Sequence, residues 1–109
     1  MEIFVFGSNL AGRHGKGAAL FALKKHGASY GQGAGIQGNS YALPTKDANI
    51  QTLPLDKINH YVRAFLIFAY EQPEYHFNIT RIGCGLAGYD WKTQIKPMFS
   101  DKPDNCTFI

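Results

Sequence analysis

The start of the chain joins a short apolar run to a glycine-rich turn and then to an amphipathic stretch. Residues 2–6, EIFVF, are nearly all apolar, which is typical of a strand covered on both faces. Residues 7–17, GSNLAGRHGKG, carry too much glycine for a regular element. From Lys16 to Lys25 apolar residues recur with helical spacing, and Gly27 ends the predicted helix. This strand, turn and helix favour an α/β fold.

The rest of the chain continues the alternation of strands and helices. The predicted elements are a strand over 40–43 that Pro44 ends, a helix from Pro54 to about Gln72, a strand over 76–82, a helix over 91–99 and a strand over 106–109. Residues 31–38, GQGAGIQG, are expected to form a loop because glycine is costly in regular elements. The order βαβαβαβ predicts one α/β domain over residues 1–109 with a largely parallel sheet, whose ligands bind at the carboxyl ends of the strands.

Composition and charge exclude several classes of function. Apolar residues make up 45% and charged residues 17%, as in globular domains rather than disordered chains. The net charge is +3 and the basic residues form no run, so a small anionic ligand fits better than duplex nucleic acid. No apolar run reaches the ~18 residues of a membrane span, and we expect no membrane partner.

Cysteine usage bears on cofactors and location. Cys84 and Cys106 have neither metal-ligand spacing nor a disulfide framework around them, and no signal peptide precedes the first strand. We therefore expect a cytoplasmic protein. No His, Cys and Asp residues have zinc or iron spacing and no Ser-His-Asp set stands out, so neither a metal nor a cofactor is predicted.

The turn after the first strand is a candidate anion site. Its glycines, among them Gly15 and Gly17, let backbone N–H groups point toward an anion, and the helix that follows adds the positive end of its dipole. Lys16 is not followed by Ser or Thr, so the segment is not a magnesium-binding Walker loop. His14 lies inside the turn and is a candidate donor to a phosphate or a ribose hydroxyl. A tight strand-to-helix turn without a ligand is the alternative.

Two later segments complete the candidate chemistry. Lys46 follows the second predicted strand beside Asp47 and could act as a nucleophile or as a phosphate-binding cation; a solvated surface lysine is the alternative. The turn GCGLAG at 83–88 matches the dinucleotide fingerprint, but too little chain follows for the βαβ unit that this fold requires. We interpret it instead as a phosphate-binding loop. Asp90 is expected to cap the last helix.

These segments resemble, in the same order, those of the macro-domain family, the α/β fold that binds ADP-ribose. They are most similar to its branch of de-ADP-ribosylating antitoxins of DNA-modifying toxins. NLAGRHGKG at 9–17 is similar to the first loop of that branch, PTK at 44–46 matches its Pro-Thr-Lys strand exit, and GCGLAGYDW at 83–91 matches its diphosphate loop. The resemblance covers almost the whole chain from Ile3 onward.

The resemblance implies a three-layer α/β/α domain with a mixed, largely parallel central sheet, in a version shortened at its N-terminus. It implies that ADP-ribose or a related nucleotide is the ligand, that Lys46 and Asn9 are the catalytic residues, and that Asn9 acts by binding hydroxyls of the distal ribose. The substrate would be ADP-ribosylated DNA or protein, and its glycosidic link would be hydrolysed without a metal. The other implied ligand-binding residues are Gly7, Ser8, His14, Gly15, Lys16, Gly17, Thr45, Gly83, Cys84, Gly85, Leu86, Ala87, Gly88 and Tyr89.

Two departures from the family leave an alternative open. The Gly-Asp-Ile segment whose Asp binds the adenine amino group in macro domains is not found ahead of Asn9, and Ala87 stands where some relatives carry a catalytic Asp. A module that binds or sequesters an ADP-ribose-type nucleotide without turnover is therefore the second hypothesis. A small interaction domain that has lost the pocket is the third. The sequence predicts no particular oligomeric state.

Overall fold

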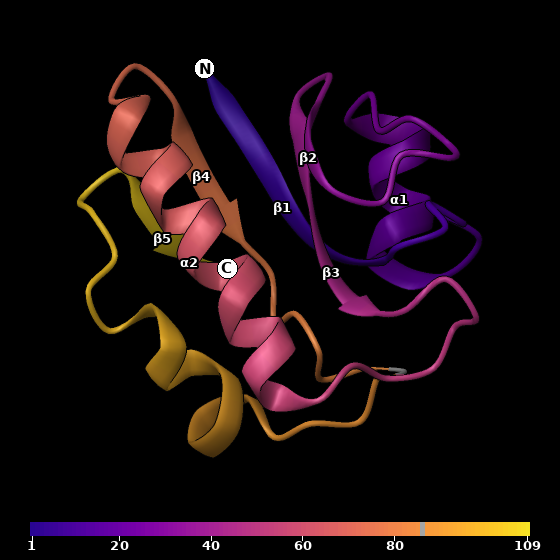
Figure 1. The fold of residues 1–109 in the computed structure, drawn as a ribbon. Helices are drawn as coiled ribbons and strands as arrows, with labels where there is room; N and C mark the ends of the chain where they lie inside the picture. Colours follow the sequence, from indigo (N-terminus) through magenta and orange to yellow (C-terminus); the bar gives the residue numbers. More distant parts are fainter. Residues whose placement is uncertain (86) are drawn as a thin grey trace.

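The computed structural model describes residues 1–85 and 87–109 of the chain. A five-stranded sheet with the order β2-β3-β1-β4-β5 forms its centre. The strands are β1 (Glu2–Asn9), β2 (Gly35–Gln37), β3 (Ser40–Lys46), β4 (His76–Ile79) and β5 (Cys106–Phe108). β1 runs parallel to β3 and β4, β5 runs parallel to β4, and β2 at the edge is antiparallel to β3. The sheet is therefore mixed and largely parallel, as predicted (Figure 1).

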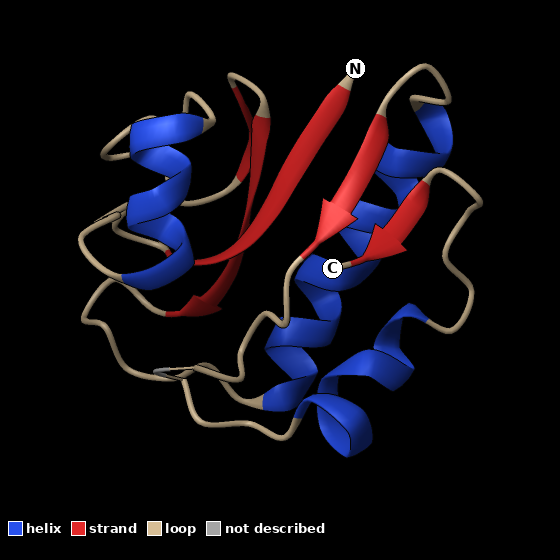
Figure 2. Ribbon diagram, turned by 180° about the vertical axis from the view of Figure 1, so that it is seen from behind, coloured by secondary structure: helices blue, strands red, loops and turns tan. Residues whose placement is uncertain are grey.

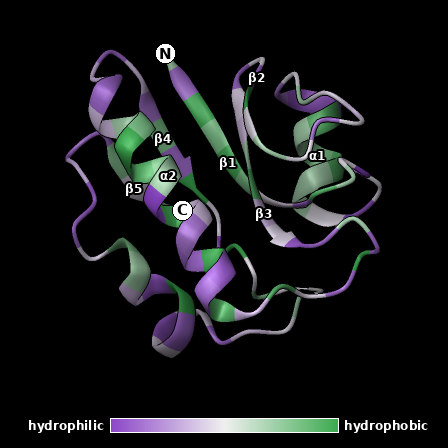
Figure 3. Cartoon of the chain, viewed as in Figure 1, coloured by the Kyte–Doolittle hydropathy of each residue, from purple (hydrophilic) through white to green (hydrophobic). Residues whose placement is uncertain are grey.

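Helices cover both faces of this sheet, with α1 (Gly17–Lys25) on one face and α2 (Leu55–Glu71) on the other (Figure 2). The buried core under α1 consists of Phe6, Ala19, Ala22, Ala28 and Ala42. The core under α2 is larger and takes Ile3 and Val5 from the same strand. Because β1 supplies side chains to both cores, its residues from Ile3 to Phe6 are all apolar (Figure 3). The predicted three-layer α/β/α arrangement is confirmed.

α2 begins after Pro54 and carries the apolar stripe that the sequence predicts. Its buried residues are Ile58, Val62, Phe65, Leu66 and Ala69. Burying a side chain such as that of Phe65 stabilises the fold by about 1.5–3 kcal/mol. The ring of Phe65 packs edge-on against Phe77 of β4, with 5.3 Å between the ring centroids. Within the part of the chain that the structure describes, none of the helices has the length and apolar character that crossing a membrane requires.

Two expectations about the sheet are wrong. Residues 31–38, predicted to form a loop, contain β2, which pairs with β3 from Ser40 to Ala42 and buries the side chain of Gln37. β3 was expected to stop before Pro44 but continues to Lys46. Proline is tolerated where a strand edge is free or its pairing is irregular. Both conditions hold at Pro44, because β2 pairs only with the first part of β3 and the register with β1 shifts just after Pro44.

The segment predicted as a helix over 91–99 is divided into two short turns. A π-helical turn, Trp91–Ile95, is followed by a 3-10 turn, Lys96–Phe99, that contains Pro97. Proline has no N–H to donate to a continuous α-helical ladder, which explains the break. The prediction that Asp90 caps the segment is confirmed, since its Oδ2 accepts a hydrogen bond of 2.9 Å from the Thr93 N–H. β4 ends at Ile79, earlier than predicted.

Candidate functional site

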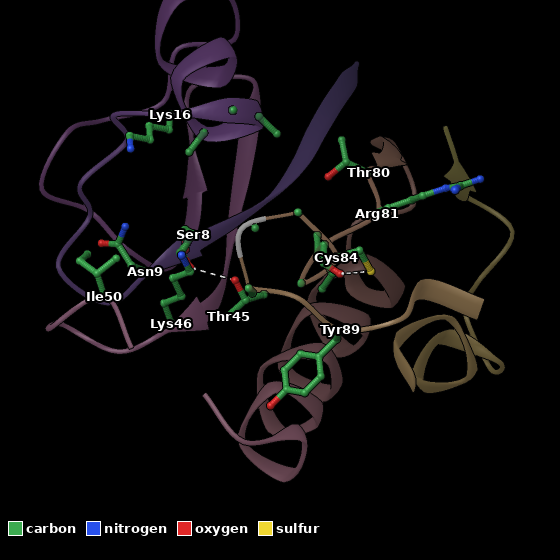
Figure 4. A pocket seen from close by; sticks show the side chains of 18 of the residues that line it. Ser8, Asn9, Lys16, Thr45, Lys46, Ile50, Thr80, Arg81, Cys84 and Tyr89 are labelled. Atoms are coloured by element: carbon green, nitrogen blue, oxygen red, sulfur yellow. Dashed lines mark hydrogen bonds between the residues drawn. The ribbon is translucent and has the colours of Figure 1, made fainter. Parts of the chain in front are cut away.

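A cavity of about 930 Å³ opens where β1, β3 and β4 end. These strands are parallel, so their carboxyl ends meet at one edge of the sheet, where ligands of α/β proteins bind. The turn after β1, the end of β3 and the loop after β4 converge on it (Figure 4). The predicted site residues that line it are Gly7, Ser8, Asn9, Gly15, Lys16, Gly17, Thr45, Lys46, Gly83, Cys84, Gly85, Ala87 and Tyr89. Gly88 lies just outside the lining, and Leu86 lies outside the described residues.

The side chain of Asn9 closes the turn that follows β1. Its Oδ1 accepts a hydrogen bond from the backbone N–H of Arg13 at 2.9 Å, and its Nδ2 donates to the carbonyl of the same residue at 3.0 Å. Asn9 is 8% exposed. An amide has two donor hydrogens and two acceptor lone pairs, so one of each remains for a ligand. Asn9 therefore shapes the turn and can still bind a hydroxyl group.

A second loop, residues 28–34, packs against this turn and is hydrogen-bonded to it. The N–H of Gly31 donates to the carbonyl of Gly12 at 2.8 Å, and the Ser8 hydroxyl donates to the carbonyl of Gly33. A Cβ at Gly33 would lie 2.3 Å from the carbonyl oxygen of Asn9, closer than any real contact. The glycine at 33 is thus required for the two loops to pack, and this packing brings Tyr30, 64% exposed, to the cavity.

The N-terminus of α1 faces the cavity without a cap. Residues 15–19 line the cavity, and no side chain that the structure describes accepts a hydrogen bond from the first turn. That turn also contains no acidic residue. The first N–H groups of a helix have no partner within the helix and carry the positive end of its dipole. This end of the cavity can therefore bind an anion.

Lys46 lies at the last position of β3, opposite Asn9 in the register of the parallel pair. Its carbonyl accepts a hydrogen bond from the Leu10 N–H at 3.0 Å, and its backbone bridges to Thr52. Its half-buried side chain lies beside Asn9 at the edge of the cavity (Figure 4). The preceding Thr45 is buried, and its hydroxyl donates to the carbonyl of Ser8 at 3.3 Å. The strand pairing thus holds Lys46 on the cavity wall.

The loop after β4 forms the opposite wall. It folds on itself through a hydrogen bond of 2.8 Å from the Tyr89 N–H to the Gly83 carbonyl, with Gly83 in the left-handed region (φ 74°). The Tyr89 hydroxyl donates to the Leu53 carbonyl at 2.7 Å, and the Thr52 hydroxyl donates to the Ala87 carbonyl at 3.3 Å. These bonds fasten the loop to the segment that follows Lys46.

The thiol of Cys84 also lines this wall. Its pKa is raised chiefly by burial and further by the nearby carboxylate of Asp90, while Arg81 opposes the shift. The Sγ atom lies 3.2 Å from the Ile82 carbonyl, to which it donates. A thiol that stays protonated is a poor nucleophile, so we assign Cys84 no covalent role.

At two glycines of the cavity, neither steric crowding nor a positive φ angle requires glycine. A Cβ at Gly15 or at Gly85 would meet no described atom within 4 Å, and neither residue has positive φ. Gly12 differs, because a Cβ there would lie 2.3 Å from the backbone of Gly31. Gly15 and Gly85 therefore leave open space that a ligand could fill up to the backbone.

Charge in the cavity is predominantly positive. The cations of the lining are Arg13, Lys16, Lys46 and Arg81. Among the lining residues that the structure describes, the carboxylate is that of Asp90, whose Oδ2 accepts bonds from Thr93. The ion pair of the described chain joins Arg63 to Asp101, away from the cavity lining. The lining cations are thus free to attract an anionic ligand.

The expectation that His14 contacts a ligand is corrected. Its ring is fully buried and packs edge-on against Phe6, with 5.2 Å between ring centroids. Its Nε2 lies 3.0 Å from the carbonyl of Gln32 and 3.1 Å from Oε1 of Gln37. Both oxygens are acceptors, so Nε2 carries a proton and donates. His14 joins the turn after β1 to residues 28–37 and faces away from the cavity.

Sequence reasoning missed several lining residues. They are Arg13, Ala18, Ala19, Tyr30, Ile50, Thr80, Arg81 and Ile82. Asp90 and Trp91, which end the motif at 83–91 but were assigned no ligand contact, also line the cavity. Thr80 and Arg81 follow a strand, and that position could have marked them. Nothing local marks Tyr30 or Ile50, because the folding of separate loops brings them to the cavity.

Comparison with known proteins supports the fold alone. No known protein family and no curated protein matches the sequence. Two solved structures from Bacteroides thetaiotaomicron are similar. One, a protein of unknown function, has a TM-score of 0.67 at 16% identity, and the match covers 99% of this chain and 87% of that one. The other has a TM-score of 0.59 at 19% identity, over 92% of this chain and 80% of that one.

Proposed function

We propose that this chain binds ADP-ribose or a close derivative and hydrolyses the glycosidic link at its distal ribose. The observation that carries the proposal is that the uncapped start of α1, the loop after β4 and Lys46 all open onto one cavity. Its volume of about 930 Å³ suits a dinucleotide-sized ligand. The resemblance of these same three segments to macro domains supports ADP-ribose as the class of ligand.

The diphosphate would lie between the start of α1 and the loop after β4. The backbone N–H groups of Cys84, Gly85 and Ala87 donate to no carbonyl within the described chain, so they are available to phosphate oxygens. Arg13 and Lys16 add positive charge on the facing wall. Backbone dipoles and the two cations would together bind the negative charge of the diphosphate.

The distal ribose would lie against Asn9 and Lys46. In the proposed reaction Lys46 first gives up a proton to the solvent, and its amine then attacks C1″ of that ribose, forming a C–N bond while the bond from C1″ to the acceptor breaks. The acceptor leaves with the bonding electrons and takes up a proton. Water then displaces the lysine from C1″, which releases ADP-ribose and restores the amine. Overall, one water is added across the bond between C1″ and the acceptor.

A binding module without turnover is the second candidate, and the cavity lining favours it in one respect. Glycoside hydrolysis ordinarily uses a pair of carboxylates as acid and base. In the described lining, Asp90 supplies the carboxylate, and that group is occupied as the cap of the next turn. Under this alternative the protein holds an ADP-ribose-type nucleotide and returns it unchanged after long incubation.

A cytoplasmic location belongs to the same proposal. Cys84 and Cys106 are both free thiols, which fits a reducing compartment. The substrate is ADP-ribosylated DNA or ADP-ribosylated protein, and assays with each substrate distinguish the two.

Release of ADP-ribose tests this function. The parent protein, Lys46→Ala and the matched control Lys57→Ala would be incubated with ADP-ribosylated DNA and with ADP-ribosylated protein, and released ADP-ribose would be measured by chromatography. Lys57 is exposed on α2 and does not line the cavity. We expect the parent and the control to release ADP-ribose at equal rates and Lys46→Ala to be slower by about 100-fold or more. Release by Lys46→Ala at the parent rate would remove Lys46 from the mechanism.

A further inference from the structure

Ile50 has a backbone conformation that its side chain disfavours. Among the non-glycine residues that the structure describes, it alone has positive φ, at 62°. The left-handed region crowds a Cβ against the backbone, and a β-branched side chain makes the crowding worse. Glycine and asparagine are the usual residues at such a position. Residues held this way cluster at functional sites, where the surrounding structure fixes them.

The loop around Ile50 is held by bonds that do not involve its side chain. The Oδ1 atom of Asp47 accepts hydrogen bonds of 2.9 Å from the N–H groups of Asn49 and Gln51. The N–H of Ile50 donates to the Asp47 carbonyl at 3.1 Å, and the N–H of Asp47 donates to the Gln51 carbonyl at 2.8 Å. The turn would therefore keep its shape with a smaller residue at position 50.

Core packing does not account for the isoleucine either. Its side chain is half-buried, and within the described residues it packs against neither of the two hydrophobic cores. It lines the cavity instead and lies beside Asn9 and Lys46 (Figure 4). An apolar group is thus held against its backbone preference at the end of the cavity that carries the reactive lysine.

We propose that Ile50 contacts the ligand and determines specificity at the Lys46 end of the cavity. This inference rests on the proposed function. The side chain packs against the distal ribose next to Lys46, so it stabilises nucleotides that carry this second sugar and contributes nothing to those that end at the diphosphate. ADP-ribose contains that sugar and ADP lacks it. The ratio of the two binding affinities therefore measures the contact between Ile50 and the distal ribose.

Two substitutions separate the side chain from the backbone strain. Ile50→Ala removes the apolar wall and keeps a Cβ, whereas Ile50→Gly removes the wall and the strain together. Ile67→Ala is the control, because Ile67 is exposed on α2 and does not line the cavity. Calorimetric titration with ADP-ribose and with ADP, and thermal unfolding of each protein, are the measurements.

Both Ile50 variants are expected to bind ADP-ribose about 5–10-fold more weakly while ADP binding stays at the parent level. Ile50→Gly is expected to melt about 3–5 °C above Ile50→Ala because the strain is gone. Suppose that the parent binds ADP-ribose and that the ratio of ADP-ribose affinity to ADP affinity is the same in the Ile50 variants as in the parent. That result would overturn this inference and leave the proposed function standing. A parent protein that binds no ADP-ribose would overturn the proposed function and this inference with it.

Discussion

Asn9 and Lys46 lie opposite each other at the ends of β1 and β3, where the register of the two parallel strands shifts. The hydrogen bond from the Leu10 N–H to the Lys46 carbonyl ties the two strand ends together at 3.0 Å. Backbone pairing, rather than contact between side chains, thus positions the two residues assigned to the distal ribose. Substitution of the Lys46 side chain should therefore leave the fold intact, so its effect on ligand binding can be interpreted directly.

Replacing Asn9 with alanine should open the turn after β1. The variant loses both bonds to Arg13, so we expect the free energy of unfolding to fall by about 1 kcal/mol and ADP-ribose affinity to fall by at least 10-fold. Urea unfolding and calorimetric titration are the measurements. Asn78→Ala is the control, because Asn78 bonds to Glu2 on the surface at the far end of β1. Equal affinity in the parent and Asn9→Ala would contradict the role given to this residue.

The glycines around the cavity should divide into two groups. Gly85→Ala is expected to unfold at nearly the parent temperature, because its new Cβ meets no described atom, yet to weaken ADP-ribose binding by about 10-fold. Gly33→Ala is expected to lose several kcal/mol of stability, because its Cβ would overlap the Asn9 carbonyl. Thermal unfolding and titration separate the two effects. Undiminished binding by Gly85→Ala would mean that no ligand reaches the backbone there.

Tyr30 should contribute to binding and little to stability. Tyr30 is 64% exposed and lines the cavity. An aromatic face left open at a binding site offers a stacking or packing surface, worth about 1 kcal/mol, which corresponds to roughly 5-fold in affinity. Tyr30→Ala should therefore bind ADP-ribose about 5-fold more weakly at an unchanged melting temperature. Tyr70→Ala, exposed on α2, serves as the matched control.

Ionisation of the Cys106 thiol should lower the free energy of unfolding at alkaline pH. Burial raises the pKa of its thiol from 9.0 to about 11. As the pH rises above 9, the unfolded chain loses this proton before the folded chain does, so stability present below pH 9 is lost between about pH 9 and 11. We expect a loss of about 1–2 kcal/mol. Urea unfolding of the parent and of Cys106→Ala at pH 8 and pH 10.5 isolates the effect, which should be smaller in the variant. Identical losses in the two proteins would exclude the thiol as the cause.

The elements that the sequence predicts well are those with a strong local pattern. The apolar stripe of α2 and the run in β1 each follow from their own residues, and so does the cap at Asp90. β2 could not be predicted in this way, because its glycine-rich segment becomes a strand only by pairing with β3. The continuation of β3 through Pro44 likewise depends on what the neighbouring strands leave unpaired.

The candidate site shows the same division. Lys46 and the glycines of the two loops were predicted from their places after strands, because strand exits in an α/β fold converge on one edge of the sheet, whereas the role of Asn9 was predicted from the resemblance to macro domains. His14 belongs to the correct loop, but its orientation is set by Gln37, which lies in the strand that the sequence did not predict. Ile50 could be recognised as a candidate ligand-binding residue only from the structure, where its φ angle is positive. Side-chain direction inside a loop depends on distant partners and leaves no local pattern.

Calorimetric titration of the parent protein with ADP-ribose tests the central claim most directly, with AMP and inorganic pyrophosphate as the comparison ligands. We expect ADP-ribose to bind in a one-to-one ratio and more tightly than either fragment, because its diphosphate and its distal ribose would occupy the same continuous cavity. Absence of heat and of thermal stabilisation with ADP-ribose would contradict this claim.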